Sequence, residues 1–218
     1  MSTSSPDGWQ SPLFRITAPI AILAGALVAV TRPVILLTTP TELDAFTAYV
    51  LSPMHAVNSV LSIVAFALLL LALVAAYDRI ARPAGLLGVI GLGTAIVGTV
   101  FMAGDWWYEA FAVPRIAEVA PEAIETFVGG RLLMGGLSSF ALFGIGWVLF
   151  GIASLRAHIY PRAISIAILV GGLLSGLPFG FTYLPGGVIH GLAFVWLGAW
   201  MVRTATTATS VAVEPAAI

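Results

Sequence analysis

The sequence predicts an all-α integral membrane protein with six transmembrane helices and both termini in the cytoplasm. Three observations lead to this prediction. The composition is too apolar for a soluble domain, six apolar runs each approach the length of a bilayer crossing, and arginines gather in alternate connections. The same pattern predicts a single transmembrane domain, residues 16–203, between short tails at residues 1–15 and 204–218.

The chain is 60% hydrophobic and 9% charged, with a mean hydropathy of +1.05. A soluble domain carries about 25% charged residues, so we expect the lipid bilayer to be the main partner of this surface. The net charge of -1 and the lack of a basic cluster argue against nucleic-acid binding. The chain has no Cys, which excludes disulfides and cysteine-ligated metals, and no Lys, which excludes a retinal Schiff base.

Six apolar runs are each close to the ~20 residues that a helix needs to cross a bilayer. They are Ile16–Leu37, Pro53–Tyr77, Ala84–Gly104, Arg131–Leu155, Ala163–Phe181 and Gly187–Val202. We expect the first run to be kept as a span rather than removed as a signal peptide, because no small-residue cleavage pattern precedes Arg32 and Pro33. The third helix is expected to continue beyond its span to Pro114.

The connections contain further structural signals. Residues 38–52 are expected to form a short helix along the membrane interface, started at Pro40 and Thr41. Residues 182–186 are expected to form a turn, and Pro178 to kink the fifth span. Glycines spaced every fourth residue in the last two spans predict surfaces for close helix packing. They are Gly172, Gly176 and Gly180, and then Gly187 and Gly191.

The placement of arginines predicts the orientation, because basic residues favour the cytoplasmic side of a membrane. One side holds six of them: Arg15, Arg79, Arg82, Arg156, Arg162 and Arg203. The opposite side holds three: Arg32, Arg115 and Arg131. Both termini are therefore expected in the cytoplasm, and most of the carboxylates lie on the outer side.

The most unusual stretch is GDWWYEAFAVP, residues 104–114, at the outer end of the third span. Asp105 and Glu109 are spaced i, i+4, so on a helix they share one face. Four aromatic residues surround them in the sequence: Trp106, Trp107, Tyr108 and Phe111. Two carboxylates among four rings, in a nearly charge-free chain, require a specific explanation.

The predicted topology brings other polar side chains to the same depth. Ionisable groups near the outer ends of five spans are expected to lie level with one another: Arg32, His55, Asp105, Glu109, Arg131 and His190. Asn58 continues the polar face of His55 on the second span, and Tyr183 lies in the turn before the last span. Ionisable groups inside a membrane are costly unless they pair or face a wet cavity.

Two interpretations remain open for this layer. In the first, Arg32 and Arg131 neutralise Asp105 and Glu109, and the rings form an aromatic belt at the interface. In the second, the layer is an outward-facing pocket between helices, lined by acids and rings. Successive aromatic residues point in several directions around a helix, so some of them face inward, and this favours the pocket.

A pocket of this kind suits acid-initiated cyclisation or isomerisation of an isoprenoid chain. Two carboxylates that share an apolar site favour one protonated group, and aromatic faces stabilise a developing carbocation. Asp105 is the preferred proton donor, Glu109 its partner or the terminating base, and His55 and Asn58 orient the carboxyl group. The other expected substrate-binding residues are Trp106, Trp107, Tyr108, Phe111, Arg32, Arg131, Tyr183 and His190. This chemistry needs neither a metal nor an organic cofactor.

In size, multispanning helical form and its acid-plus-aromatic cluster, the chain resembles the small membrane-bound terpene cyclases. The resemblance is organisational and implies a prenyl-chain substrate without assigning a catalytic residue. The segment from Trp106 to Pro121 is similar to segments of uncharacterised small multispanning membrane proteins of actinobacteria, which imply no function.

Two alternatives to an isoprenoid enzyme stay open. His55 and His190 come from different spans at similar depth, as the axial ligands of a haem do, which suggests a haem or quinone protein. Intramembrane acids and histidines also mark ion paths, which suggests a transporter or a non-enzymatic accessory subunit. The charged residues are expected at one face of the membrane only, and this argues against an ion path across it.

Overall fold

A computed structural model describes residues 12–40, 43–125, 130–178 and 180–213. Its helices, in chain order, are α1 (Pro12–Thr38), α2 (Leu43–Val50), α3 (Pro53–Val119), α4 (Pro121–Glu125), α5 (Gly130–Ala157), α6 (Arg162–Ser175) and α7 (Gly180–Val213). The described residues contain no strand, so the predicted all-α class is confirmed.

Four helical stretches are long and apolar enough, by length and composition, to cross a membrane. They are Ile16–Thr38, Pro53–Val119, Leu133–Ala157 and Phe181–Ala205. The surface agrees with a lipid surrounding, because large apolar side chains such as Leu86 and Met134 are exposed along the bundle. This is the architecture of an all-α membrane protein.

The 67-residue helix α3 contains both the second and the third predicted span, because it folds back on itself. The break is at Gly85, whose φ of 55° and ψ of -145° lie outside the helical region and suit a residue without Cβ. We call residues 53–84 the first arm and residues 86–119 the second arm. Their far ends meet, since His55 contacts Glu109.

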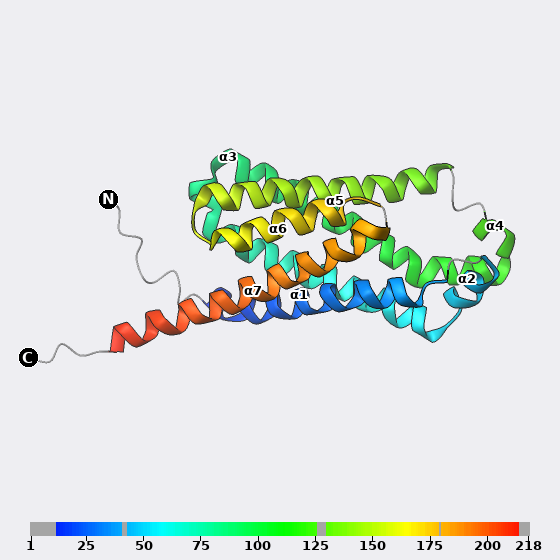
Figure 1. The fold of residues 1–218 in the computed structure, drawn as a ribbon, viewed down its shortest axis with the longest axis horizontal. Coiled ribbons are helices and arrows are strands. Elements are labelled where there is room, and N and C mark those ends of the chain that lie inside the picture. The colour runs from blue at the N-terminus through cyan, green and yellow to red at the C-terminus, as the bar shows by residue number, and fades with distance from the viewer. Residues whose placement is uncertain (1–11, 41–42, 126–129, 179, 214–218) are drawn as a thin grey trace, which may run out of the picture.

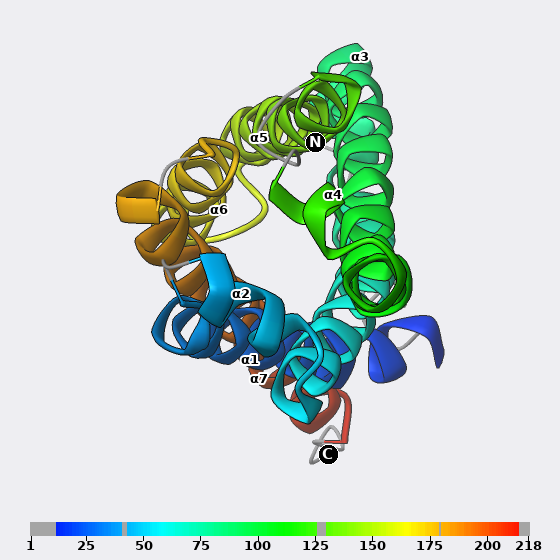
Figure 2. The same ribbon diagram turned by 90° about the vertical axis from the view of Figure 1, so that its right-hand side faces the viewer.

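The helices form a closed ring around the long axis. α1 packs against α3 and α7, α5 packs against α3 and α6, and α6 packs against α7. Figure 1 shows α1 beginning and α7 ending at one end of this bundle, while α2 and α4 lie at the opposite end. Figure 2 looks onto the end with α2 and α4 and shows the ring of longer helices behind them.

Aromatic side chains fill the middle of the ring. Trp147 of α5 is fully buried, its indole N–H donates to the Thr99 hydroxyl at 3.2 Å, and its ring packs edge-on against Phe150 and Phe194. At the end opposite α2, the Tyr160 hydroxyl donates to the backbone carbonyl of Ala76 at 2.6 Å. These contacts fasten α5 and the turn after it to the two arms of α3.

Between the last two spans, two predicted boundaries and the predicted kink at Pro178 were wrong. α6 ends at Ser175, short of the predicted end of the fifth span at Phe181, so Pro178 lies in a turn and does not kink a helix. The physical reason is that the residue before a proline disfavours helical geometry, and a proline cannot donate to the preceding turn. The predicted turn at 182–186 is helical instead, because α7 begins at Gly180 and includes Pro185 near its start.

Helix ends also extend past the predicted tails. α1 begins at Pro12 rather than Ile16, and α7 runs to Val213, ten residues beyond Arg203. The third helix passes Pro114 and ends at Val119. The predicted interfacial helix in residues 38–52 is α2, although Thr41 lies outside the described residues.

Glycines allow the helices to approach closely, as their spacing predicts. A Cβ on Gly176 would overlap the backbone of Gly144, and one on Gly191 would overlap the backbone of Gly25. The second arm of α3 also packs closely at a glycine, since a Cβ on Gly98 would overlap the backbone of Phe143 in α5. Gly180 begins α7, so it does not continue the stripe on α6.

Replacement of Gly98 by Ala is expected to lower the melting temperature of the purified protein. Overpacking against backbone that cannot move aside costs about 1–3 kcal/mol. Gly93 is the matched control, because it lies on the same arm and a Cβ there meets nothing within 4 Å. Circular dichroism melts in detergent should show a loss for Gly98→Ala and none for Gly93→Ala; equal melting temperatures would contradict this packing.

Candidate functional site

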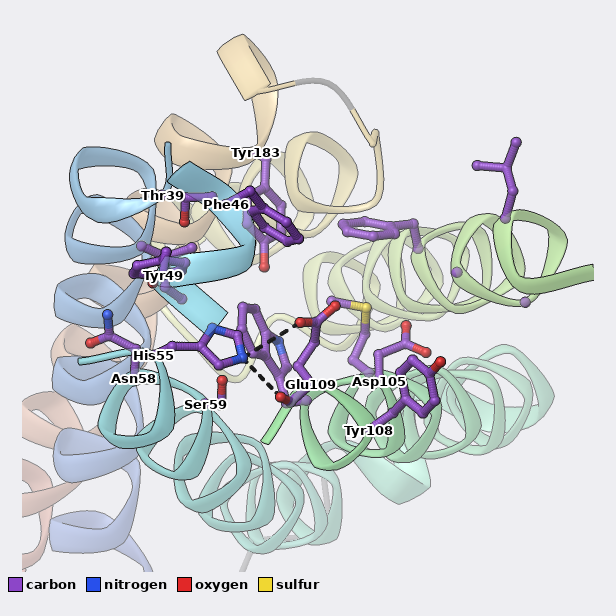
Figure 3. Close-up of a pocket in the computed structure, with 17 residues that line it drawn as sticks. Thr39, Phe46, Tyr49, His55, Asn58, Ser59, Asp105, Tyr108, Glu109 and Tyr183 are labelled. Atoms are coloured by element: carbon purple, nitrogen blue, oxygen red, sulfur yellow. Dashed lines mark hydrogen bonds and ion pairs between the residues drawn. The ribbon is translucent and has the colours of Figure 1, made fainter. Parts of the chain in front are cut away.

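A cavity of about 530 Å³ lies beside α2, which contributes Phe46 and Tyr49 to its lining. Small-molecule sites span roughly 300–1,000 Å³, so this volume suits a small organic ligand. Its wall comes from five helices, α1, α2, α3, α5 and α7 (Figure 3). The lining residues are Ile35, Thr39, Phe46, Tyr49, His55, Asn58, Ser59, Met102, Asp105, Trp106, Tyr108, Glu109, Leu133, Gly135, Gly136, Phe140 and Tyr183.

The two arms of α3 meet at the cavity through His55 and Glu109. His55 lies in the first turn of α3, which Pro53 begins and the Ser52 hydroxyl caps by accepting the His55 backbone N–H at 3.3 Å. The His55 Nε2 atom lies 2.8 Å from the Glu109 backbone oxygen and 3.8 Å from its carboxylate (Figure 3). Because the carbonyl can only accept, Nε2 carries the proton and donates it.

A second set of hydrogen-bonded side chains connects α1, α2 and the first arm of α3. The Asn58 amide donates to the Thr38 hydroxyl at 3.4 Å, and that hydroxyl lies 3.3 Å from the Tyr49 hydroxyl. The Tyr49 ring packs edge-on against His55, with ring centroids 5.2 Å apart. Asn58 therefore lines the cavity but bonds to α1, and it does not orient a carboxyl group as the sequence suggested.

Asp105 and Glu109 lie one turn apart on the second arm, and both line the cavity. Their spacing on one helical face follows directly from the sequence. Glu109 contacts His55, while Asp105 has Ser139 of α5 as its polar neighbour. Two carboxyl groups with different neighbours can take different parts in a proton transfer.

Arg32 does not neutralise either carboxylate. Its guanidinium carbon lies 5.0 Å from the Phe66 ring centroid, 5.0 Å from that of Trp106 and 4.8 Å from that of Tyr183. The residue is only 3% exposed, and its Nη1 has no hydrogen-bond partner among the described residues. The expected ion pairs of Arg32 are therefore wrong: three rings hold the cation instead. The side chain of Arg131, on the first turn of α5, lies outside the described residues.

His190 is fully buried in the middle of the bundle and does not line the cavity. Its ring centroid lies 4.5 Å from that of Trp147, 5.3 Å from that of Phe194 and 5.6 Å from that of Phe143. His55 faces the cavity, whereas His190 is enclosed by these rings. The two imidazoles therefore do not face the same cavity, as the two axial ligands of one haem would.

The rings of the aromatic-acidic stretch divide between two faces. Trp106 and Tyr108 line the cavity. Trp107 and Phe111 pack on each other, with ring centroids 5.6 Å apart. Both lie on the outer surface, where they are 57% and 56% exposed, so they do not belong to the wall. One residue on a helix turns the side chain by about 100°, so consecutive rings cannot all face one pocket.

Several lining residues were not predicted from the sequence. Phe46 and Tyr49 come from α2, at i, i+3 spacing on one helical face, and this spacing was a usable signal. Phe140 lies ten residues into α5, and its ring packs edge-on against Tyr183 at 5.4 Å. No local pattern distinguishes Phe140 from a lipid-facing ring, because its partner is distant in the sequence.

Comparison with protein-family models, with curated proteins and with solved structures finds no match for this chain. Function is therefore argued from the cavity itself. Its side chains offer two carboxyl groups, an imidazole beside one of them, and walls of aromatic rings. This set can give a proton to an apolar ligand, hold positive charge and take a proton back.

The cavity can be tested with a thiol probe, because the chain has no native Cys. Ser59 and Ser165 are both fully buried, but only Ser59 lines the cavity. Since thiol reactivity follows access, Ser59→Cys should react with a small methanethiosulfonate reagent at least about tenfold faster than Ser165→Cys. Equal rates would show that this space does not admit small molecules.

Proposed function

We propose that this protein is a membrane-embedded enzyme that cyclises or isomerises an isoprenoid chain by acid initiation. One observation carries the proposal: the side chains of Asp105 and Glu109 both line an apolar cavity walled by aromatic rings. In size, multispanning helical form and its acid-plus-aromatic cluster, the chain resembles the small membrane-bound terpene cyclases, and this resemblance supports the proposal. Because the proposed reaction rearranges bonds within one molecule, it needs no second substrate.

The two carboxyl groups of the cavity provide and remove every proton that the proposed reaction needs. The Asp105 carboxyl O–H gives its proton to an alkene carbon of the substrate, and the alkene π pair forms the new C–H bond. The cation left on the neighbouring carbon is attacked by a second alkene, which forms a C–C bond. Glu109 then removes a proton from the carbon beside the final cation, and that C–H pair becomes a new double bond. The two carboxyl groups exchange the proton to restore the starting state.

The aromatic rings of the cavity fall into two groups: those that contact Arg32 and those that can stabilise a substrate cation. Arg32 already occupies faces of Trp106 and Tyr183, so these rings are poor partners for a substrate cation. Phe46, Tyr49 and Phe140 line the same cavity, and no described arginine lies over their rings. Each ring stabilises a cation by roughly 0.5–2 kcal/mol. His55 is a positioning residue, because it acts through its contact with Glu109.

We further propose that the chain crosses the cell membrane six times, with both termini in the cytoplasm. Supporting this are α1, the two arms of α3, α5 and α7, together with the basic turns after residues 77 and 155. α6 is the short crossing, since its 14 residues rise about 21 Å against a hydrocarbon core of ~30 Å. The cavity then faces the outside of the cell.

The orientation is tested by labelling single cysteines in intact cells. Leu51, in the turn before α3, and His158, in the turn after α5, are both exposed and lie in different turns. A membrane-impermeant maleimide should label Leu51→Cys at once and label His158→Cys only after the cells are permeabilised. The reverse pattern would place the cavity on the cytoplasmic side.

The chemistry is tested by Asp105→Asn and Glu109→Gln in membranes incubated with linear isoprenoid alcohols and acids. A general acid contributes roughly a hundredfold to ten-thousandfold in rate, so each variant should lose product by at least the lower of these factors. Glu118→Gln is the matched control, because Glu118 lies on the same arm, is exposed and pairs with Arg115 at 2.9 Å. Full turnover by both cavity variants would refute the proposal.

A further inference from the structure

The proposed function leaves the polar end of the substrate undefined, and Arg32 addresses it. We propose that Arg32 forms a cationic floor beneath the residues that line the cavity, and that the ligand is an isoprenoid whose carboxylate reaches this guanidinium and accepts hydrogen bonds from the N–H groups of Nη1. This inference rests on the proposed function for the isoprenoid chain. The carboxylate site itself is argued from the position and surroundings of Arg32.

Arg32 lies on the face of α1 that looks toward the cavity. Ile35 and Thr39 both line the cavity, and they follow Arg32 at i+3 and i+7, so the three share one helical face. Arg32 is the deepest of the three, one turn below Ile35. Its guanidinium packs against Trp106 and Tyr183, which are part of the wall. Arg32 itself is not a lining residue, so a ligand in the cavity reaches it past these two rings.

The first arm of α3 continues the polar surface toward the same depth. Ser59 lines the cavity, and Ser62 and Phe66 follow it at i+3 and i+7 on the same face. The Phe66 ring is one of the three that hold Arg32. Both serine hydroxyls are buried and have no hydrogen-bond partner among the described residues. A polar row therefore leads from the cavity toward the cation.

The rings hold Arg32 but leave its hydrogen bonding incomplete. A guanidinium keeps its charge at all physiological pH values, and its five N–H bonds lie in its plane. The faces of aromatic rings attract the positive charge, but they do not accept hydrogen bonds from the N–H groups as an oxygen atom would. Nη1 is buried and unpartnered among the described residues, and neither Asp105 nor Glu109 forms an ion pair with Arg32. A buried charge without a counterion favours binding of an anion.

A carboxylate fits this floor better than a phosphate. The planar fork of Arg matches the two oxygens of a carboxylate, and one negative charge balances one positive charge. A phosphate ester carries up to two negative charges, and the second would remain unpaired in a cavity that already contains Asp105 and Glu109. With its carboxylate on Arg32, the substrate extends its chain along the wall that bears the two acids.

The test compares ligands that share one carbon skeleton. Geranic acid, geraniol and geranyl phosphate are titrated at neutral pH into the purified protein in nanodiscs, with tryptophan fluorescence as the readout. A charge-assisted hydrogen-bonded pair favours the acid over the alcohol by at least about tenfold in Kd. Arg32→Gln should abolish this preference, Arg32→Lys should keep part of it, and Arg115→Gln, at an exposed arginine, should leave it unchanged.

Two results would overturn the inference: equal affinity of the wild-type protein for the acid and the alcohol, or an unchanged preference in Arg32→Gln. Tighter binding of geranyl phosphate than of geranic acid would overturn the choice of carboxylate. If Arg32→Gln does not fold, the wild-type comparison and Arg32→Lys still decide the question. If the wild-type protein shows no preference for the acid but turnover still depends on Asp105 and Glu109, only this inference is refuted. If the wild-type protein prefers the acid but turnover does not depend on the two carboxyl groups, only the proposed function is refuted.

Discussion

The contact between His55 and Glu109 closes the hairpin of α3 and so defines the candidate site. The two residues are 54 positions apart, and they meet because the helix reverses at Gly85. Without this reversal, the carboxyl-bearing second arm would not face the polar first arm. The cap at Ser52 and the start at Pro53 then fix where His55 enters the first turn. The part of the cavity wall that α3 provides thus depends on the reversal at Gly85 and the helix cap at Ser52.

Opposite charges lie apart around the cavity. The second arm of α3 provides the carboxyl groups that line it, whereas Arg32 of α1 lies behind the lining residues Trp106 and Tyr183, on their aromatic faces. The guanidinium is thus held without a salt bridge to Asp105 or Glu109, and the Glu109 carboxylate lies 3.8 Å from His55 Nε2. This separation lets one end of a ligand meet a cation while another part meets proton donors. If every charged group were paired within the protein, a ligand would meet neither a free cation nor a free proton donor.

Much of this site follows from local sequence. The i, i+4 spacing of Asp105 and Glu109 predicts one shared face, and the alternation of apolar runs predicts that His55 lies at the same end of the bundle. These inferences need only helix geometry and membrane thickness. The same geometry says that Trp106, Trp107 and Tyr108 cannot all face one pocket, but not which of them faces inward. Trp107, expected to bind the substrate, lies on the outer surface instead.

The remaining features depend on contacts between distant segments. Whether Arg32 pairs with a carboxylate or with rings is decided by how α1, α3 and α7 pack. The boundary between α6 and α7 was missed because two prolines, Pro178 and Pro185, compete as helix breakers, and only the first ends a helix. Phe140 joins the wall through a ring contact with α7, which no local pattern encodes.

Acid initiation is the central claim, and isotope incorporation tests it most directly. The protein is incubated in deuterium oxide with geranic, farnesoic and geranylgeranoic acids, and the recovered organic acids are analysed by mass spectrometry. The account predicts a rearranged product that carries one deuterium on carbon, because the carboxyl proton exchanges with solvent before it is transferred. Recovery of all three acids unchanged and without deuterium would contradict it.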